Sequence, residues 1–305
     1  MYDLIIVGGG PAGVSAGVYA ARKRLKTLLI AESFGGQSME SAGIENWIGV
    51  KNVSGKDFAR MLEEHLQAVA SQSVEIALSE RVAKVEKEEN GFEVKTEEGK
   101  QYKAKTVLVA TGSTRRKLDI QGAKEFEGKG LTYCASCDGP VFAGQAVAVI
   151  GGGNAGFETA AQLLAYATTV TLLNRSDSFK ADETTVNKVL AHPNMTAIKN
   201  AIPKEIRGNK FVDTMIYHSD DGEHELKVSG IFVEIGLIPA TKFVEGLVEL
   251  NSLGQIKIDH KTGRASLEGI WAAGDSSDGL YHQNNIAAGD AVKALEDIYL
   301  YLHAR

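Results

Sequence analysis

Apolar and polar residues follow the same order twice along this chain. In each half, an apolar strand runs into a glycine-rich turn and then into a helix of small residues. The first copy begins at Leu4–Gly13 and its helix is expected to reach about Arg24; the second begins at Ala146–Gly156 and its helix is expected to reach about Tyr166. A short apolar strand follows each helix. We therefore predict a diverged internal repeat of one strand–turn–helix–strand unit.

Segments of strict alternation mark a second element in each half. Residues 81–112 alternate between apolar and polar side chains with glycine turns between the runs, which is typical of a small antiparallel meander. A similar meander is expected near 204–230. Each ends in an apolar strand and a glycine, Thr106–Gly112 and Ile231–Gly236. The chain is therefore predicted to be an α/β protein.

The two copies are expected to form two domains. The joints are predicted at 113–118 and 239–245, just after the glycine that ends each copy, so the second domain would be inserted into the first. The assigned ranges are 1–115 (first domain, first part), 116–240 (second domain) and 241–305 (first domain, second part). The other expectations are a loop at 121–130, a return to the first domain at 256–259 and 269–275, and a closing helix at 284–302.

Each glycine-rich turn has the context that dinucleotide binding needs. The first glycine makes the turn, the second admits a pyrophosphate, and the third lets the helix pack on the strand. Pro11 lies early in its helix, where a missing N–H costs little. The predicted binding residues are Gly8, Gly10, Pro11, Ala12 and Gly13 in the first copy and Gly151, Gly153, Asn154 and Gly156 in the second. We predict two bound dinucleotides.

The residues after the second strand of each copy bear on which dinucleotide binds. Ala31 occupies the place of the usual ribose-binding acid, and Glu32 follows it. In the second copy the segment is Asn174-Arg175-Ser176, and Lys180 lies further on. No carboxylate here would repel a 2′-phosphate, and Arg175 and Lys180 could pair with one, or simply be exposed charges on a loop. This pattern favours NADPH and leaves NADH open.

The two cysteines of the chain, Cys134 and Cys137, lie three residues apart between the two turns. A C-x-x-C pair can close a redox disulfide, and Asp138 could accept or donate the proton that thiol–disulfide exchange moves. The alternatives are half of a zinc site or an inert pair. A zinc site needs four ligands, and His218 and His224, on an expected turn, do not have ligand spacing. We predict no metal.

Composition excludes several classes of partner. The 305 residues carry a net charge of −6, without a basic cluster, which argues against nucleic acid. No apolar run has the length of a membrane span. The N-terminus enters a strand at once, without the features of a signal peptide. Two cysteines provide no disulfide scaffold, so the expected location is cytoplasmic.

Taken together, the motifs resemble the low-molecular-weight thioredoxin reductase family over nearly the whole chain. The residues that carry the resemblance are Gly8-x-Gly10-Pro11-Ala12-Gly13, Gly35-Gly36-Gln37, Glu45-Asn46-Trp47, Ala110-Thr111-Gly112, Cys134-x-x-Cys137-Asp138, Gly151–Gly156 and Ala273-Gly274-Asp275. The resemblance implies two Rossmann-like domains of three-layer ββα architecture, FAD in the first, NAD(P)H in the second, and a homodimer. The FAD-binding residues that it adds are Glu32, Gly36, Gln37, Asn46, Thr111, Gly112, Gly274, Asp275, His282 and Gln283. The NAD(P)H-binding residues that it adds are Asn174, Arg175, Ser176 and Lys180.

Some segments are closer to the flavoprotein subunit of alkyl hydroperoxide reductase, notably Phe34–Gln37 and Tyr281–Gln283. That flavoprotein carries a thioredoxin-like extension before its FAD fingerprint, which here opens at residue 8. A separate protein is therefore expected to take the electrons. Three positions depart from the thioredoxin reductase pattern: Asn174-Arg175-Ser176 replaces His-Arg-Arg, His282 replaces an arginine, and Ser136 replaces a threonine.

The resemblance also implies the mechanism. NAD(P)H reduces FAD, the flavin reduces the Cys134–Cys137 disulfide through Cys137, and Cys134 attacks the disulfide of thioredoxin or a thioredoxin-like protein. Because the disulfide cannot face the flavin and a bulky protein together, a rotation of the inserted domain is expected. The alternatives are a peroxiredoxin system served by a separate carrier, a ferredoxin-dependent variant, and a flavin redox sensor without turnover.

Overall fold

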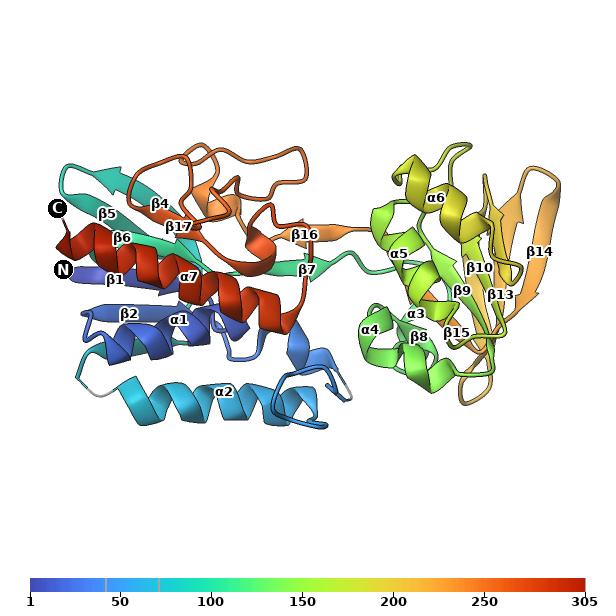
Figure 1. Ribbon diagram of the computed structural model, residues 1–305, viewed down its shortest axis with the longest axis horizontal. Coiled ribbons are helices and arrows are strands. Elements are labelled where there is room, and N and C mark those ends of the chain that lie inside the picture. The colour runs from blue at the N-terminus through green and yellow to red at the C-terminus, as the bar shows by residue number, and fades with distance from the viewer. Residues whose placement is uncertain (42, 71, 305) are drawn as a thin grey trace. The chain divides into compact units, whose positions relative to one another are not determined.

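The computed structural model describes residues 1–41, 43–70 and 72–304. Contacts between residues divide the chain into two compact units. The first unit combines residues 1–114 with those from 238 onward, and the second comprises residues 115–237 (Figure 1). The second unit is inserted into the first.

The elements of each unit follow in chain order. The first unit contains β1 (Tyr2–Val7), α1 (Pro11–Arg22), β2 (Thr27–Ala31), the 3-10 helix η1 (Gly36–Glu40), α2 (Gly55–Ala70), β3 (Val74–Leu78), β4 (Val82–Glu88), β5 (Gly91–Thr96), β6 (Gln101–Val109), the 3-10 helix η3 (Lys242–Val244), β17 (Ile270–Ala272), the 3-10 helix η4 (Gly274–Ser276) and α7 (Asn284–His303). The second unit contains α3 (Ala123–Phe126), β8 (Leu131–Thr132), α4 (Ala135–Asp138), the 3-10 helix η2 (Gly139–Phe142), β9 (Ala146–Ile150), α5 (Asn154–Leu163), β10 (Thr169–Leu173), α6 (Glu183–Leu190), β11 (Met195–Ile198), β12 (Ile202–Gly208), β13 (Val212–Ser219), β14 (Gly222–Lys227) and β15 (Gly230–Val233). At the boundaries, β7 (Ser113–Arg115) and β16 (Leu237–Pro239) pair with each other.

A parallel sheet forms the middle of the first unit. Its strands lie in the order β3-β2-β1-β6, and β17 also pairs with β6. The beginning of β6 pairs with β5 in the opposite direction, and β5 pairs with β4. The predicted meander is therefore present, and it branches from the parallel sheet through one shared strand.

The two faces of this sheet carry separate cores, because successive side chains of a strand point to opposite faces. On one face, Leu4 and Ile6 of β1 pack in a cluster with residues of α1, α2 and α7 (Figure 1). On the other face, Ile5 and Val7 pack with Phe92 of the meander. Helices, parallel sheet and meander thus form three layers, which confirms the predicted ββα architecture.

The second unit repeats these layers. Its parallel strands lie in the order β11-β10-β9-β15-β8, and β12, β13 and β14 form an antiparallel sheet. Val149 of β9 packs with Phe157 of α5, whereas Ile150 packs with Met215 of the meander. Both copies of the predicted repeat therefore fold as Rossmann-like units.

The sequence pattern missed helices α2 and α6 and was wrong about residues 121–130. Helix α2 buries Phe58, Leu62 and Leu66 at helical spacing. It lies close to α1 because Gly17 has no side chain; a Cβ there would be 2.8 Å from Leu66 Cδ1. Residues 121–130, expected as a loop, contain α3, which buries Ala123 and Phe126 in the core of the second unit.

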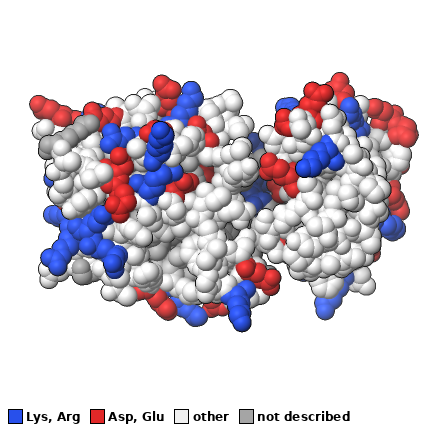
Figure 2. Space-filling view, viewed as in Figure 1, with Lys and Arg blue, Asp and Glu red and all other residues white. Residues whose placement is uncertain are grey.

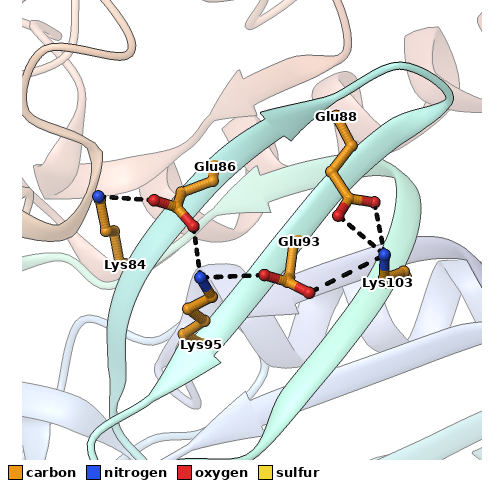
Figure 3. A network of polar contacts seen from close by, with 6 residues as sticks. All are labelled: Lys84, Glu86, Glu88, Glu93, Lys95 and Lys103. Carbon is orange, nitrogen blue, oxygen red and sulfur yellow. Dashed lines mark hydrogen bonds and ion pairs between the residues drawn. The ribbon is translucent and has the colours of Figure 1, made fainter.

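A network of charged residues covers the meander of the first unit (Figure 3). Glu86 lies opposite Glu93 in the β4–β5 register, and Lys84 lies opposite Lys95. Like charges in such positions destabilise a sheet, but each of these lysines bonds to Glu86 at 2.6 Å. Hydrogen bonds from Lys84 and Lys95 lower the pKa of Glu86 to about 2. Since exposed ion pairs contribute little stability, the network mainly compensates the facing like charges.

Candidate functional site

Both glycine-rich turns are packed so tightly that their first and last positions accept only glycine. A Cβ added to Gly8, which has φ of +120°, would lie 2.3 Å from the Ala110 carbonyl oxygen. A Cβ on Gly13 would lie 1.8 Å from the Gly8 carbonyl oxygen. The second turn repeats these contacts at Gly151 and Gly156, with distances of 2.1 and 1.8 Å. In each unit the helix therefore begins in direct contact with the end of the central strand.

The middle glycines differ, because a Cβ on Gly10 or Gly153 would meet no described atom within 4 Å. Each is the N-cap residue of a helix, α1 or α5, and among the described residues no side chain caps either one. Free N–H groups and the positive end of the helix dipole favour an anion at such a position. Space and charge at both turns fit a pyrophosphate.

Four polar residues form a chain in the first unit. Gln37 Nε2 donates a hydrogen bond to the Ser113 carbonyl oxygen, and Ser113 Oγ donates one to Asp275 Oδ2 at 3.4 Å. His282 Nδ1 lies 3.3 Å from Asp275 Oδ1. The structure thus brings together three of the residues predicted for the first cofactor. Ser113 was not predicted, because nothing in the sequence distinguishes a serine at the start of a short strand.

Asn46 and Gln283 meet although they are far apart in the sequence. Asn46 Nδ2 donates to Gln283 Oε1 at 3.2 Å, and Asn285 Nδ2 donates to the Asn46 carbonyl oxygen at 2.7 Å. Gly36 lies against the first turn, since a Cβ there would be 3.6 Å from the Gly10 Cα. The segment after β2 is therefore held between the turn and the start of α7.

Other predicted residues of the first unit have protein partners. Glu32 is exposed at the end of β2 and forms an ion pair with Arg81 at 3.2 Å. Thr111 Oγ1 donates to a backbone carbonyl of the same unit at 2.7 Å. Gly112 and Gly274, with φ of +66° and +67°, turn the chain where β6 and β17 end. These residues line the end of the sheet from which the glycine-rich turn projects.

Cys134 and Cys137 form a disulfide in the second unit, with their Cα atoms 5.3 Å apart. Both residues are half-buried. Thr132, which is buried, connects this pair to Asp138: its hydroxyl accepts a hydrogen bond from the Cys134 N–H at 3.3 Å and donates one to the Asp138 carboxylate. Sequence reasoning missed Thr132, because a threonine in a short strand carries no distinctive signal.

The segment after β10 is fastened to the second glycine-rich turn. Asn174 is 5% exposed, and its amide donates to two carbonyls of this segment at 2.8 and 2.9 Å. The Lys180 N–H donates to the Gly152 carbonyl at 2.9 Å, and Asn154 accepts a backbone N–H just beyond at 2.8 Å. Arg175 and Lys180 are exposed, and neither forms an ion pair within the described residues. The Asn174 amide thus holds the segment in shape, while the two cations face solvent.

Glu234, directly after β15, is a titratable residue that the sequence did not single out. Its side chain is 14% exposed, its Oε1 accepts a hydrogen bond from Thr159 Oγ1 at 2.9 Å, and Arg115 lies 3.9 Å away. Burial raises the pKa of Glu234 above its ordinary value, although Arg115 and Thr159 act in the opposite direction. A half-buried acid at the end of a parallel strand is a candidate for function.

Other kinds of site are not found in the described chain. No group of three or more His, Cys, Asp or Glu residues there is arranged to hold a metal ion. His218 and His224, expected on a turn, lie instead on the paired strands β13 and β14. None of the described helices is long and apolar enough to cross a bilayer. Acidic and basic side chains are interspersed over the visible face (Figure 2).

Comparison with known proteins agrees with this geometry. A family model described as pyridine nucleotide-disulphide oxidoreductase matches residues 2–291. The chain is 42% identical over 303 residues to an NADH dehydrogenase of Bacillus subtilis, covering 99% of this chain and 58% of that protein. It is 41% identical over 297 residues to one subunit of the alkyl hydroperoxide reductase of Pseudomonas putida, covering 96% and 56%. The chain therefore spans a little over half the length of these relatives.

Solved structures show the same fold over the whole chain. A thioredoxin reductase from Streptococcus pyogenes has 34% identity and a TM-score of 0.89, and the match covers 100% of this chain and 99% of that one. A thioredoxin reductase from Giardia duodenalis has 32% identity and a TM-score of 0.92, with 99% and 98% covered. These matches confirm the predicted fold and the resemblance from which it was inferred.

Proposed function

Because the chain belongs to the pyridine nucleotide-disulphide oxidoreductase family, we propose that it is an FAD-dependent reductase of protein disulfides. It takes electrons from NADPH or NADH and passes them to thioredoxin or a thioredoxin-like protein. The observation that carries this proposal is the Cys134–Cys137 disulfide, located in the unit that also holds the second glycine-rich turn. A thiol pair beside a dinucleotide-binding turn is suited to transferring electrons between a nicotinamide coenzyme and an external disulfide.

The first unit would hold FAD. The turn at Gly10 and the start of α1 would bind the pyrophosphate, and Glu32 would reach the ribose if it released Arg81. Gln37, Asn46 and the His282 pair with Asp275 would contact the flavin half. A flavin supplies the chemistry that side chains lack, because it accepts a hydride and returns electrons to a disulfide.

The residues of the second unit carry out the exchange. Two electrons and two protons convert the Cys134–Cys137 disulfide to two thiols. The Cys134 thiolate then attacks one sulfur of the substrate disulfide, forming a mixed disulfide and releasing one substrate thiolate. Cys137 attacks Cys134, releases the second substrate thiol and restores the internal disulfide. Asp138, held by Thr132, is positioned to take and return the proton.

The substrate proposal rests on the solved structures, which are thioredoxin reductases and match this chain at full length. The relation to alkyl hydroperoxide reductase favours a second candidate, in which the acceptor is a thioredoxin-like carrier that serves a peroxiredoxin. Turnover measured with thioredoxin and with such a carrier will separate the two.

Anaerobic titration of the FAD-loaded protein tests the proposal. Adding NADPH or NADH is expected to bleach the flavin absorbance, and an external disulfide such as DTNB is then expected to restore it with release of thiol. Flavin that neither coenzyme reduces would overturn the assignment of the electron donor. Flavin that is reduced but returns no electrons to disulfides would favour a redox sensor.

Arg175 and Lys180 are expected to set the preference for NADPH. Replacing both with alanine should weaken binding of 2′,5′-ADP by about tenfold to a hundredfold, because each removes a charge-assisted contact with the 2′-phosphate. Binding of 5′-AMP should change little. The measurement is isothermal titration calorimetry, with Lys204→Ala on β12 as the matched loss of an exposed charge. Equal weakening of both nucleotides would show that the two cations do not recognise the phosphate.

A further inference from the structure

Glu234 occupies a position at which the two halves of the repeat differ. In the second unit β15 pairs with β9 so that Val233 faces Ile150, and Glu234 follows. In the first unit β6 pairs with β1 in the same way, and the residue that follows is Ala110. The backbone contacts agree, because the carbonyl oxygen that excludes a Cβ from the glycine-rich turn belongs to Ala110 in one unit and to Glu234 in the other. Packing at this position therefore requires no acid.

The sheet topology places this position beside one half of a bound dinucleotide. From β9 the chain proceeds to β10 and β11 on one side and later returns to β15 on the other. A dinucleotide binds in the crevice where the strand order reverses, across the carboxyl ends of the central strands. Its adenosine half lies on the β10 side, where Asn174 ends the strand. The nicotinamide half then extends to the β15 side, where Glu234 lies.

The Glu234 side chain is held in a defined position. Thr159, a buried residue of α5, donates its hydroxyl proton to Oε1 at 2.9 Å. Arg115 of β7 lies 3.9 Å from Oε2, too far for a direct hydrogen bond. Glu158 on α5 adds to the effect of burial, and the pKa of Glu234 is raised. The carboxyl group is thus anchored by one oxygen, and its partial exposure leaves the other oxygen able to meet a ligand.

We infer that Glu234 contacts the carboxamide of the bound nicotinamide and orients its ring, an inference that rests on the proposed function of this unit. A carboxamide offers one acceptor oxygen and two N–H donors, so either protonation state of a carboxyl group can pair with it. The first unit, which would bind a flavin and not a nicotinamide, has alanine at the same place. The difference between the repeats thus follows the difference between their ligands.

Matched ligands that contain or lack the nicotinamide test this inference by equilibrium binding. Glu234→Ala is expected to weaken binding of NADP⁺ by about tenfold, the order expected for one lost hydrogen bond in a half-buried site. It should leave binding of 2′,5′-ADP, which lacks the nicotinamide half, within about twofold of the wild type. Glu234→Gln keeps an acceptor and a donor at this place and should bind NADP⁺ nearly as the wild type does. NAD⁺ and 5′-AMP form the corresponding pair if the protein prefers NADH.

The possible outcomes separate this inference from the function on which it rests. If the wild-type protein binds NADP⁺ and Glu234→Ala binds it equally well, the inference is wrong and the proposed function stands. Equal weakening of NADP⁺ and 2′,5′-ADP would indicate a general disturbance of the unit and would also overturn the inference. If the wild-type protein binds none of these nucleotides, the proposed function is wrong and the inference is wrong with it. Thermal melting of both variants checks that the unit remains folded.

Discussion

Replacing Cys137 with serine is expected to lower the NADPH-driven reduction of thioredoxin by about a thousandfold or more, because the electron-carrying disulfide can no longer form. The remaining Cys134 thiolate can still attack a substrate but cannot be released from it. A thioredoxin with a single cysteine, activated as its thionitrobenzoate disulfide, should therefore remain covalently attached to this variant. Non-reducing electrophoresis and release of thionitrobenzoate measure the attachment.

The complementary variants locate the attacking sulfur. Cys134→Ser should lose turnover to the same extent but trap little substrate, since the proposed attacking group is missing. Ser136→Ala is the matched control, because Ser136 is exposed between the two cysteines and its hydroxyl bonds only to the Gln162 side chain among the described residues. It should keep nearly full activity. Equal trapping by the two cysteine variants would contradict the roles assigned to them.

Replacing Gly156 with alanine is expected to destabilise the second unit by about 3 kcal/mol or more, the upper range for overpacking a core. The added Cβ would lie 1.8 Å from the Gly151 carbonyl oxygen. Both atoms belong to the backbone or are fixed to it, so no side-chain rotation can relieve the clash, and α5 would have to move away from β9. Thermal melting or urea denaturation should show early unfolding of this unit, with loss of nucleotide binding.

Gly153→Ala provides the contrast within the same turn. Gly153 has φ of −94°, which alanine adopts easily, and its Cβ would meet no described atom within 4 Å. We expect the unit to keep its stability while nucleotide binding weakens, because the methyl group would occupy the space left for the pyrophosphate. If Gly153→Ala bound nucleotide normally, this turn would not be the pyrophosphate site.

Sequence reasoning predicted the repeat because its signals are local. The runs at Leu4–Val7 and Ala146–Ile150 each meet a glycine-rich turn within a few residues, and the structure shows β1 and β9 there, each followed by its helix. The cysteine pair was equally visible, since its spacing alone allows a disulfide. Helix α2 was missed although Phe58, Leu62 and Leu66 have helical spacing, because neither a turn motif nor a recognisable repeat draws attention to it.

The sequence by itself determined which chemistry this protein carries: two glycine-rich turns, one thiol pair and a pattern of alternation that folds twice into the same layers. Only the tertiary structure decided how the polar side chains around those motifs are used. It placed Thr132 between Cys134 and Asp138. It committed the Asn174 amide to its own backbone segment. It buried Glu234 where its repeat partner is alanine. Such choices depend on contacts between strands and helices distant in sequence, and residue type and spacing along the chain do not encode them locally.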